Sequence, residues 1–322
     1  MVELCRGGQS RRKFLTGVAT GALTAGSLSI GSQAFAFVPP EVLPVTVPTA
    51  TLQAFDLADV TLGEGPFLHA QRKTEAYLLA LQPDRMLHNF RVNAGLAPKA
   101  PVYGGWESDP LWADINCHGH TLGHYLSACA LVYRSTGDRR FKARIDHIAR
   151  ELAACQAASG TGLVCAFPDG PALVAAHLHG DPITGVPWYT LHKVYAGLRD
   201  ATLLADSDTA RAVLLRLADW AVVASRPLSD AQFETMLDTE HGGMNEVFAD
   251  LYTMTGTAEY RTMAERFSHK AILAPLAKSR DHLDGLHANT QVPKIVGFQR
   301  VWEVTGSPNT ARRPNSSGRR SR

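Results

Sequence analysis

The sequence predicts an all-α fold built from consecutive helical hairpins, arranged as a stack or ring. Apolar residues recur with the 3.6-residue period of helices, and one motif that ends a helix recurs along the chain. Each hairpin pairs a helix that is apolar on most sides with a helix that is apolar on one side. Repeats of roughly 50–70 residues of this kind bury their apolar faces against the next repeat.

Composition places the chain among ordinary globular proteins. Hydrophobic residues make up 45% and charged residues 19%, which excludes collagen-like, mucin-like, coiled-coil and largely disordered chains. Of the 32 Lys and Arg residues, nine lie in residues 1–36 and 309–322, whereas only one of the 30 acidic residues does. The body between these ends is therefore acidic, which argues against a nucleic-acid partner.

The N-terminus has the pattern of an export signal. Two arginines, Arg11 and Arg12, precede a weakly apolar stretch that ends near Ala34-Phe35-Ala36, a cleavage motif. We expect residues 1–36 to be a twin-arginine signal peptide and 37–54 a linker, with the mature protein periplasmic or secreted. The apolar stretch is too short for a membrane anchor, so none is expected after cleavage. A disordered basic tail is the alternative.

Paired helices are predicted along the body. Amphipathic helices are expected over 139–156, 208–225 and 258–274; in the first, Phe141, Ile145, Ile148, Leu152 and Cys155 share one face. The preceding segments, 118–135, 188–205 and 244–255, are small or apolar on most sides and carry His or Glu. We expect them to be inner helices, covered on both sides. A last helix is expected over 292–305.

The helix ends share a motif in which an aromatic residue stands three positions before Thr-Gly. A glycine there accepts the left-handed conformation that ends a helix, and a following Asp, Thr or Ser caps the next one. The motifs are Tyr133-x-x-Thr136-Gly137-Asp138, Tyr252-x-x-Thr255-Gly256-Thr257 and Trp302-x-x-Thr305-Gly306-Ser307, with a weaker one at Ala205-Asp206-Ser207. About three hairpins fit this length. The ring is therefore expected to be incomplete, with an apolar face of helix 292–305 uncovered.

Polar side chains recur where the inner helices begin. The segments are Cys117-His118-Gly119-His120-Thr121-Leu122-Gly123-His124, Trp188-Tyr189-Thr190-Leu191-His192-Lys193, Glu240-His241-Gly242-Gly243-Met244-Asn245-Glu246 and His287-Ala288-Asn289-Thr290-Gln291. Buried polar groups need partners, and a polar pocket lined by aromatic rings suits a sugar. Tyr103-Gly104-Gly105-Trp106-Glu107 is interpreted as a loop at the pocket edge.

Several of these residues have a second interpretation. His120 and His124 have the i, i+4 spacing of a metal pair, although no carboxylate ligand accompanies them. Glu246 is either a general acid or a bridge between helix ends, and Asp250 is expected to pair with an Arg or Lys. The four cysteines of the body show no C-x-x-C spacing. We expect buried thiols, and one disulfide bridge is the alternative.

The motifs resemble glycoside hydrolase family 127, the β-L-arabinofuranosidase-like proteins, over about residues 55–308. The resemblance rests on segments that follow the order of the family: Phe55-Asp56-Leu57, Gly65-Pro66-Phe67, Asn93-Ala94-Gly95-Leu96, Tyr103-Gly104-Gly105-Trp106-Glu107, Gly119-His120-x-x-Gly123-His124, Trp188-Tyr189-x-x-His192-Lys193, His241-Gly242-Gly243-Met244-Asn245-Glu246 and Leu286-His287-Ala288-Asn289-Thr290-Gln291.

The resemblance implies an (α/α)6 barrel, here incomplete and without the family's β-sandwich domains, acting on plant-derived L-arabinofuranosides. It implies sugar contacts at His124, His192 and His287, and less securely at Glu246, Asn289 and Gln291. Characterised members of the family resemble one another in using a Cys nucleophile, a Glu acid/base and a zinc ion held by Cys and Glu. None of those catalytic or metal positions matches Cys117, Cys129, Cys155 or Cys165, so no catalytic residue, metal ligand or cofactor is assigned to this chain.

We therefore expect the N-terminal portion of an exported retaining glycosidase, truncated and inactive as written. A non-catalytic carbohydrate-binding helical module and a histidine-based metal protein are the competing hypotheses. Residues 309–322 have no apolar period, and we expect a disordered tail or the product of a shifted reading frame. The sequence does not name the sugar, the linkage or the oligomeric state.

Overall fold

The computed structural model describes residues 54–108 and 115–306. All of them lie in one of the two units into which the chain divides, Val42–Arg322. The expected signal peptide, nearly all of the linker and the tail at 309–322 lie outside the described residues.

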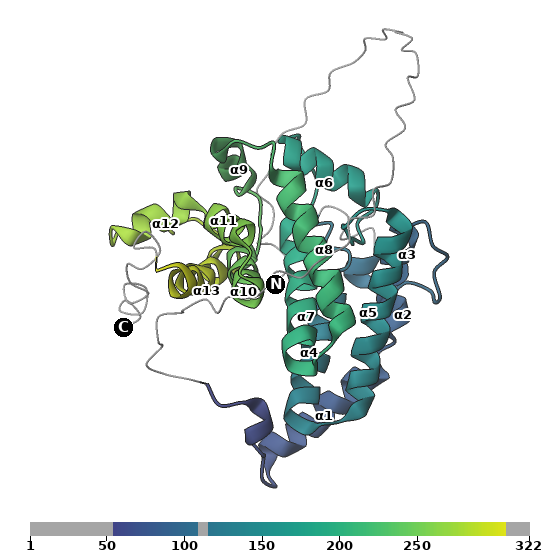
Figure 1. Cartoon of the computed structure of the whole chain (residues 1–322). Coiled ribbons are helices and arrows are strands. Elements are labelled where there is room, and N and C mark those ends of the chain that lie inside the picture. Colours follow the sequence, from purple (N-terminus) through teal and green to yellow (C-terminus); the bar gives the residue numbers. More distant parts are fainter. Residues whose placement is uncertain (1–53, 109–114, 307–322) are drawn as a thin grey trace, which may run out of the picture. The chain divides into compact units, whose positions relative to one another are not determined.

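Every regular element in the described part of the chain is helical, which confirms the all-α prediction (Figure 1). The α-helices are α1 (Pro66–Ala80), α2 (Pro83–Met86), α3 (His88–Asn93), α4 (His120–Thr136), α5 (Arg139–Ser159), α6 (Gly170–His179), α7 (Pro187–Ala205), α8 (Asp208–Ser225), α9 (Asp230–Met236), α10 (Met244–Thr255), α11 (Ala258–Arg266), α12 (Lys270–Ala277) and α13 (Ala288–Thr305). Two 3₁₀ turns, Leu57–Asp59 and Gly105–Glu107, complete the set.

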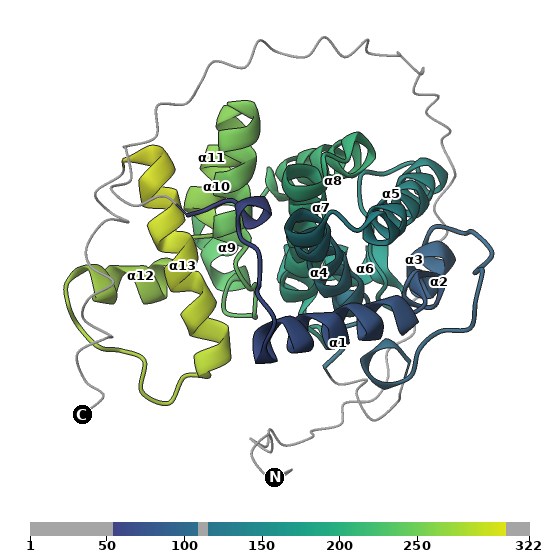
Figure 2. The same ribbon diagram turned by 90° about the horizontal axis from the view of Figure 1, so that it is seen from below.

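The helices form two layers of consecutive neighbours. The hairpins α4–α5, α7–α8 and α10–α11 each pack internally, and in the inner layer α4 contacts α7, α7 contacts α10 and α10 contacts α13. In the outer layer α5 contacts α8 and α8 contacts α11. Figure 2 shows α13 beside α10 and α7 beside α4. This is the hairpin arrangement of an α/α barrel, as predicted.

The predicted helix ends are confirmed in detail. Gly137, Gly256 and Gly306 have positive φ angles of 68°, 70° and 63°, and each donates its N–H to the carbonyl of the motif's aromatic residue at 2.8 Å. The weaker junction is also a helix end, because Asp206 adopts the left-handed conformation and the Ser207 side chain caps α8. At Gly137 and Gly256 the motif is therefore the boundary between an inner and an outer helix, and at Gly306 it ends α13.

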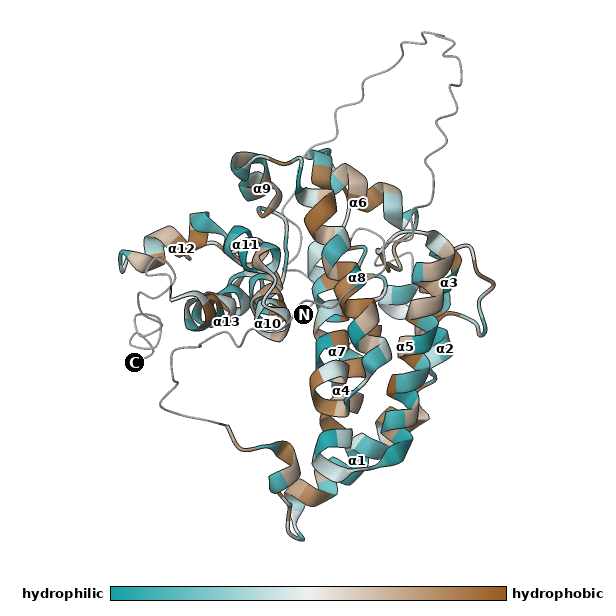
Figure 3. Cartoon of the chain, in the orientation of Figure 1, coloured by the Kyte–Doolittle hydropathy of each residue, from teal (hydrophilic) through white to brown (hydrophobic). Residues whose placement is uncertain are grey.

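The hydrophobic core lies between the two layers. Phe141, Ile145 and Ile148 on α5 are fully buried, as are Trp188 and Tyr195 on α7. Figure 3 shows hydrophobic segments along α4, α7 and α8, whereas α1 is mostly hydrophilic. The four thiols of the described residues are free and buried, so the prediction of buried cysteines is confirmed.

One helix prediction was wrong. The segment expected as a single helix over 258–274 is divided into α11 and α12, because His269 leaves the helical conformation between them. Its ring accepts a hydrogen bond from the buried Lys294 ammonium of α13, with Nζ 2.9 Å from Nδ1. Met263 and Phe267 are buried as predicted, but Ala271 is exposed. α11 thus ends at Arg266, and His269, held by a contact with another helix, precedes α12.

The last helix begins earlier than predicted and carries an uncovered apolar face. Val292 and Val296 are 58% and 56% exposed, which agrees with the expectation for helix 292–305. No helix among the described residues has the length and hydropathy required to cross a membrane.

Candidate functional site

The N-terminal ends of the inner helices place a set of polar side chains close together, which we call the cup. Its members are His120 and His124 of α4, Tyr189, His192 and Lys193 of α7, Glu240 and Glu246 before and within α10, and His287 at the start of α13. The connections α5–α7, α8–α10 and α11–α13 all return the chain to this end of the inner layer.

Glycines allow α4 and α7 to approach closely beside the cup. A Cβ placed on Gly123 would lie 2.1 Å from the carbonyl oxygen of Lys193, and one on Gly197 would lie 2.6 Å from the carbonyl oxygen of Gly123. No residue with a side chain fits either position without moving a backbone. The contact sets His124, the residue after Gly123, against Lys193.

His120 is a buried, neutral imidazole. Its Nδ1 lies 2.8 Å from the Cys117 carbonyl oxygen, and burial lowers its pKa to about 4. Because a carbonyl only accepts, Nδ1 carries the proton and Nε2 remains an acceptor. The ring lies 4.6 Å from the Trp106 ring and 5.8 Å, edge to face, from the His124 ring. His120 therefore connects the Trp106 loop to the cup.

His192 is enclosed between α7 and the start of α10. Burial lowers its pKa well below the ordinary value, and the positive charge of Lys193 acts in the same direction. The Lys193 ammonium lies 3.3 Å from His192 Nδ1, so Nδ1 accepts and Nε2 carries the proton. A Cβ on Gly243 would lie 3.0 Å from that Nε2 and 3.3 Å from Glu246 Oε2. His192 and Glu246 thus flank the same glycine.

Lys193 lies at the centre of the cup. Its ammonium is 4.5 Å from the centre of the Tyr189 ring, a cation–π distance. Burial lowers its pKa, opposed by the negative charges of Glu246 and Glu240, and its own charge lowers the pKa of His124 further than partial burial alone. One cation therefore links the helices of the cup electrostatically.

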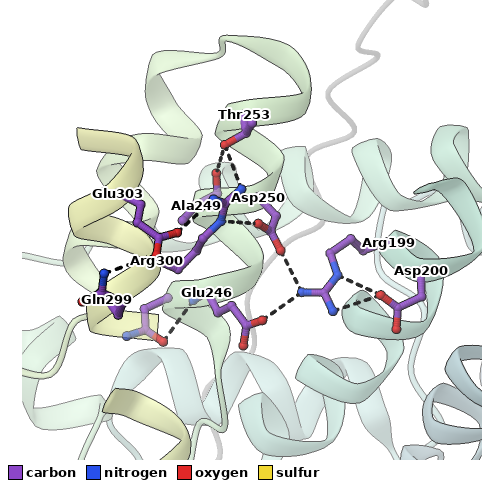
Figure 4. A network of polar contacts seen from close by, with 10 residues as sticks. Arg199, Asp200, Glu246, Ala249, Asp250, Thr253, Gln299, Arg300 and Glu303 are labelled. Atoms are coloured by element: carbon purple, nitrogen blue, oxygen red, sulfur yellow. Dashed lines mark hydrogen bonds and ion pairs between the residues drawn. The ribbon is translucent and has the colours of Figure 1, made fainter. Parts of the chain in front are cut away.

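Glu246 is anchored by an ion-pair network on the inner helices (Figure 4). Arg199 Nη1 lies 3.2 Å from Glu246 Oε1 and 2.7 Å from Asp250 Oδ2. Asp250 Oδ1 in turn lies 2.7 Å from Arg300 Nε of α13. Asp250 therefore pairs with arginines, as predicted. Glu246 thus bridges α10 to the interior of α7, with Oε2 on the side of His192, and its role as a general acid or a bridge between helix ends stays a prediction.

The start of α13 joins the cup through Glu240. The Thr290 hydroxyl donates to Glu240 Oε1 at 2.6 Å, and His287 Nδ1 lies 3.3 Å from the same oxygen. The Asn289 side chain lies within hydrogen-bonding reach of the Tyr189 hydroxyl. His287 and Asn289 are exposed. These contacts bring residues of α7 and α13 to one side of the cup.

The structure thus brings most of the predicted site residues together, but not all of them. His124, His192 and Glu246 surround Lys193, and His287 and Asn289 join them through Glu240 and Tyr189. Gln291 does not join this group through its Oε1, which is buried without a hydrogen-bond partner. Whether any of these residues contacts a sugar stays a prediction.

The expected aromatic lining was partly wrong. Trp188 is fully buried, its ring centre lies 5.1 Å from that of Phe267, and its Nε1 donates to Met236 Sδ at 3.2 Å. It is a core residue because the helix turns it toward the outer layer. The half-buried Tyr189 is an aromatic ring of the cup, and Trp106, 42% exposed, lies beside it against His120.

Three charged residues of this region were not selected from the sequence: Glu107, Lys193 and Glu240. Glu107 is 4% exposed; it accepts the Gly119 N–H at Oε2, 2.8 Å away, and its Oε1 has no hydrogen-bond partner. Burial raises its pKa. The motifs containing these residues were recognised, but spacing alone does not tell which charged residue of a motif turns inward.

The described residues do not fit the zinc site that the resemblance implies. No group of three His, Cys, Asp or Glu side chains in the described ranges is arranged to hold a metal ion. Burial raises the pKa of Cys117 to about 11, with Glu240 and Glu107 acting in the same direction, and raises that of Cys165 to about 12. No catalytic step through zinc is therefore derived from these residues.

Comparison with known proteins identifies the family. None of the curated proteins compared with the chain matches it. The family model described as the β-L-arabinofuranosidase GH127 catalytic domain matches residues 59–316, most of the chain and nearly all of the described helices. Together with the layered hairpins and the polar cup, this match shows that the chain belongs to the β-L-arabinofuranosidase-like glycoside hydrolases of family 127.

Proposed function

We propose that the cup binds the arabinofuranosyl unit of plant-derived L-arabinofuranosides. The observation that carries this proposal is the convergence of side chains from α4, α7 and α10 around Lys193, which the start of α13 joins through Glu240 and Tyr189. Neutral imidazoles both donate and accept, and the carboxylates of Glu240 and Glu246 accept, which matches the adjacent hydroxyls of a furanose. The exposed Trp106 ring offers an apolar face to the sugar ring.

A binding comparison tests this proposal. The full chain is titrated calorimetrically with methyl β-L-arabinofuranoside and with the corresponding arabinopyranoside. We expect the furanoside to bind more tightly, and His124→Ala to weaken its binding by about two- to tenfold, the value of one hydrogen bond. His69→Ala, an exposed histidine of α1, is the matched control and should bind like the wild type. Equal affinity of wild type and His124→Ala contradicts the proposal.

We also propose that the chain of 322 residues binds the sugar without hydrolysing it. The resemblance implies a thiolate nucleophile, and the described thiols are buried, with burial raising the pKa values of Cys129 and Cys155 to about 11. This supports the competing hypothesis of a binding module. Incubation with p-nitrophenyl β-L-arabinofuranoside, with and without added zinc, should release no nitrophenol; zinc-dependent release would overturn the proposal.

Export by the twin-arginine pathway is a further proposal, and rests on the motif of residues 1–36 alone. Fused to a folded fluorescent reporter, residues 1–36 should direct it to the periplasm. The double variant Arg11→Lys/Arg12→Lys should retain the reporter in the cytoplasm, and unchanged export of that variant would contradict the proposal.

A further inference from the structure

Two buried ionisable side chains meet where α13 packs against the segment between α11 and α12. Lys294 of α13 is 1% exposed, and His269, which precedes α12, is 5% exposed. The Lys294 Nζ lies 2.9 Å from His269 Nδ1, and α12 lies next to α13 in both Figure 1 and Figure 2. The sugar binding proposed above uses neither side chain.

The Lys294–His269 pair requires a neutral histidine. Burial lowers the pKa of Lys294 to about 8, so its side chain is an ammonium at pH 7. An ammonium only donates hydrogen bonds, so His269 Nδ1 accepts and Nε2 carries the ring proton. A second ring proton would occupy Nδ1, and two donors of like charge would then face each other. Protonation of His269 and the hydrogen bond from Lys294 therefore exclude each other.

Carboxylates on the far side of the ring offer a protonated His269 another partner. Glu234 Oε1 of α9 and Asp238 Oδ1 each lie 3.6 Å from His269 Nε2, just beyond hydrogen-bonding distance. From the segment before α10 the His241 ring faces His269 at 5.6 Å, and burial lowers its pKa to about 3, so it is neutral. Burial and the charge of Lys294 lower the pKa of His269, while the two carboxylates oppose them. An imidazolium would thus be drawn toward the carboxylates and away from Lys294.

The same face of α13 makes the contacts with the cup. Thr290 lies one turn before Lys294, and its hydroxyl donates to Glu240 Oε1 at 2.6 Å. His287 Nδ1 lies 3.3 Å from the same oxygen. The charge of Glu240 also acts on Lys294. Because a single helical turn joins Lys294 to Thr290, a displacement of the lysine disturbs the contacts that hold His287 and Glu240.

We propose that the Lys294–His269 pair is an acid-sensitive latch that holds the start of α13, and with it His287 and Glu240, in place for sugar binding. The inference rests on the proposed function and adds a regulation of the same site by pH. The latched state binds fewer protons than a free histidine, which titrates near pH 6.5, so the latch weakens as the pH falls below about 6.5. Above pH 8 the neutral Lys294 amine still donates, so the latch persists there.

Two substitutions remove the acid sensitivity from opposite sides of the pair. His269→Asn keeps an acceptor at the position of Nδ1 but does not titrate. Lys294→Met keeps the length of the side chain and removes the charge that opposes protonation of His269. The exposed histidine of α1 supplies the matched control, His69→Asn.

Amide hydrogen exchange of the full chain at pH 7 and 5.5, corrected for the intrinsic rates, measures the latch directly. In the wild type, protection of residues 288–294 should fall more than protection of α5, by up to about tenfold per pH unit, the limit for uptake of one proton. The comparison with α5 removes the change that global stability causes. This excess loss should disappear in His269→Asn and in Lys294→Met, and it should persist in His69→Asn.

Calorimetry at the same two pH values connects the latch to the cup. The wild type should bind methyl β-L-arabinofuranoside less tightly at pH 5.5 than at pH 7. Both latch variants should lose a smaller part of their affinity. A remaining loss is expected in every protein, because His124 of the cup still titrates.

The outcomes separate this inference from the proposed function. If protection of residues 288–294 falls no more than that of α5, or if the excess loss persists in either latch variant, the inference is wrong. It is also wrong if the wild type and the latch variants lose the same share of affinity. A wild type that binds no sugar at pH 7 overturns the proposed function, and the exchange measurement alone then decides whether the latch exists.

Discussion

Burial keeps individual histidines of the cup neutral, and their neighbours determine which ring nitrogen carries the proton. His120 keeps its proton on Nδ1 for the Cys117 carbonyl, and His192 keeps its proton on Nε2 because Nδ1 faces the Lys193 ammonium. The two imidazoles are neighbours of one cation and are neutral at pH 7. Neutral imidazoles of this kind suit sugar hydroxyls, because each ring offers one donor and one acceptor without adding a charge.

Buried neutral histidines make the stability of the fold depend on pH. Burial lowers the pKa of His120 to about 4 and that of His241 to about 3, whereas an unfolded histidine titrates near pH 6.5. Between these values the unfolded chain binds more protons, so the free energy of unfolding falls as the pH falls from about 6.5 to about 4. His120 alone contributes roughly 2–3 kcal/mol of this loss. Denaturant unfolding at pH 7, 6 and 5 measures it.

The variant His120→Gln provides the control, because glutamine keeps a donor and an acceptor but does not titrate. Its unfolding free energy should fall less steeply between pH 6.5 and 5 than that of the wild type. Equal pH dependence in the two proteins would mean that His120 is not buried neutral.

Arg199 is the residue on which the position of Glu246 depends. It is 17% exposed and faces the carboxylates of Asp200, Glu246 and Asp250. Removing it takes away the arginine that the three carboxylates share and leaves Asp250 with Arg300 alone, so Arg199→Ala should lower the unfolding free energy by about 2–4 kcal/mol.

The same substitution frees Glu246 Oε1 and should weaken sugar binding through that residue. In a double-mutant cycle, the effects of Arg199→Ala and Glu246→Gln on the affinity for methyl β-L-arabinofuranoside should not add. Arg199→Lys, which keeps the charge, should restore part of the affinity. If the effects of the two substitutions on affinity add, and Arg199→Lys restores no affinity, Arg199 has a structural role only.

At the scale of elements, the cup is built by the close approach of α4 and α7. Gly123 and Gly197 permit backbone contact there, so the spacing between His124 and Lys193 depends on the absence of two side chains. The analogous contact of α10 and α13 uses Gly297, where a Cβ would lie 1.9 Å from Asn245 Oδ1. Glycines inside these helices are therefore packing residues.

The sign of the stability change caused by Gly123→Ala tests this packing. In an open helix position alanine stabilises by about 1 kcal/mol relative to glycine, but here its Cβ collides with the Lys193 carbonyl. We expect lower stability, by about 1–3 kcal/mol as for overpacked cores, together with weaker sugar binding. A rise in the melting temperature of Gly123→Ala would contradict the close approach of α4 and α7.

Helix ends were predictable from sequence because their physics is local. The Tyr133, Tyr252 and Trp302 motifs contain the glycine and the acceptor carbonyl within one turn, so the residues needed for the prediction are adjacent. The division at His269 was not predictable, because its cause, the Lys294 ammonium, lies on another helix. The same holds for Trp188, whose partners Met236 and Phe267 are distant in sequence.

At the scale of the described helices, a layered hairpin fold delivers polar groups from separate segments to one end. The sequence supplied the motifs and their order, and predicted that His124, His192 and Glu246 belong together. It did not supply Lys193, Glu240 or Glu107, because a charged residue inside a motif is equally compatible with the surface. Only the packing of α4, α7, α10 and α13 distinguishes these positions.

The most direct test of the cup is a nuclear magnetic resonance titration of the histidine rings in the full chain. With selectively labelled histidine, added methyl β-L-arabinofuranoside should shift the ring resonances of His120, His124 and His192 together, with one common dissociation constant. The resonance of His147, which pairs with Asp84 on the α5 side, should not move. If the sugar left the three cup resonances unchanged, or shifted His147 equally, the side chains at these helix ends would not form one sugar site.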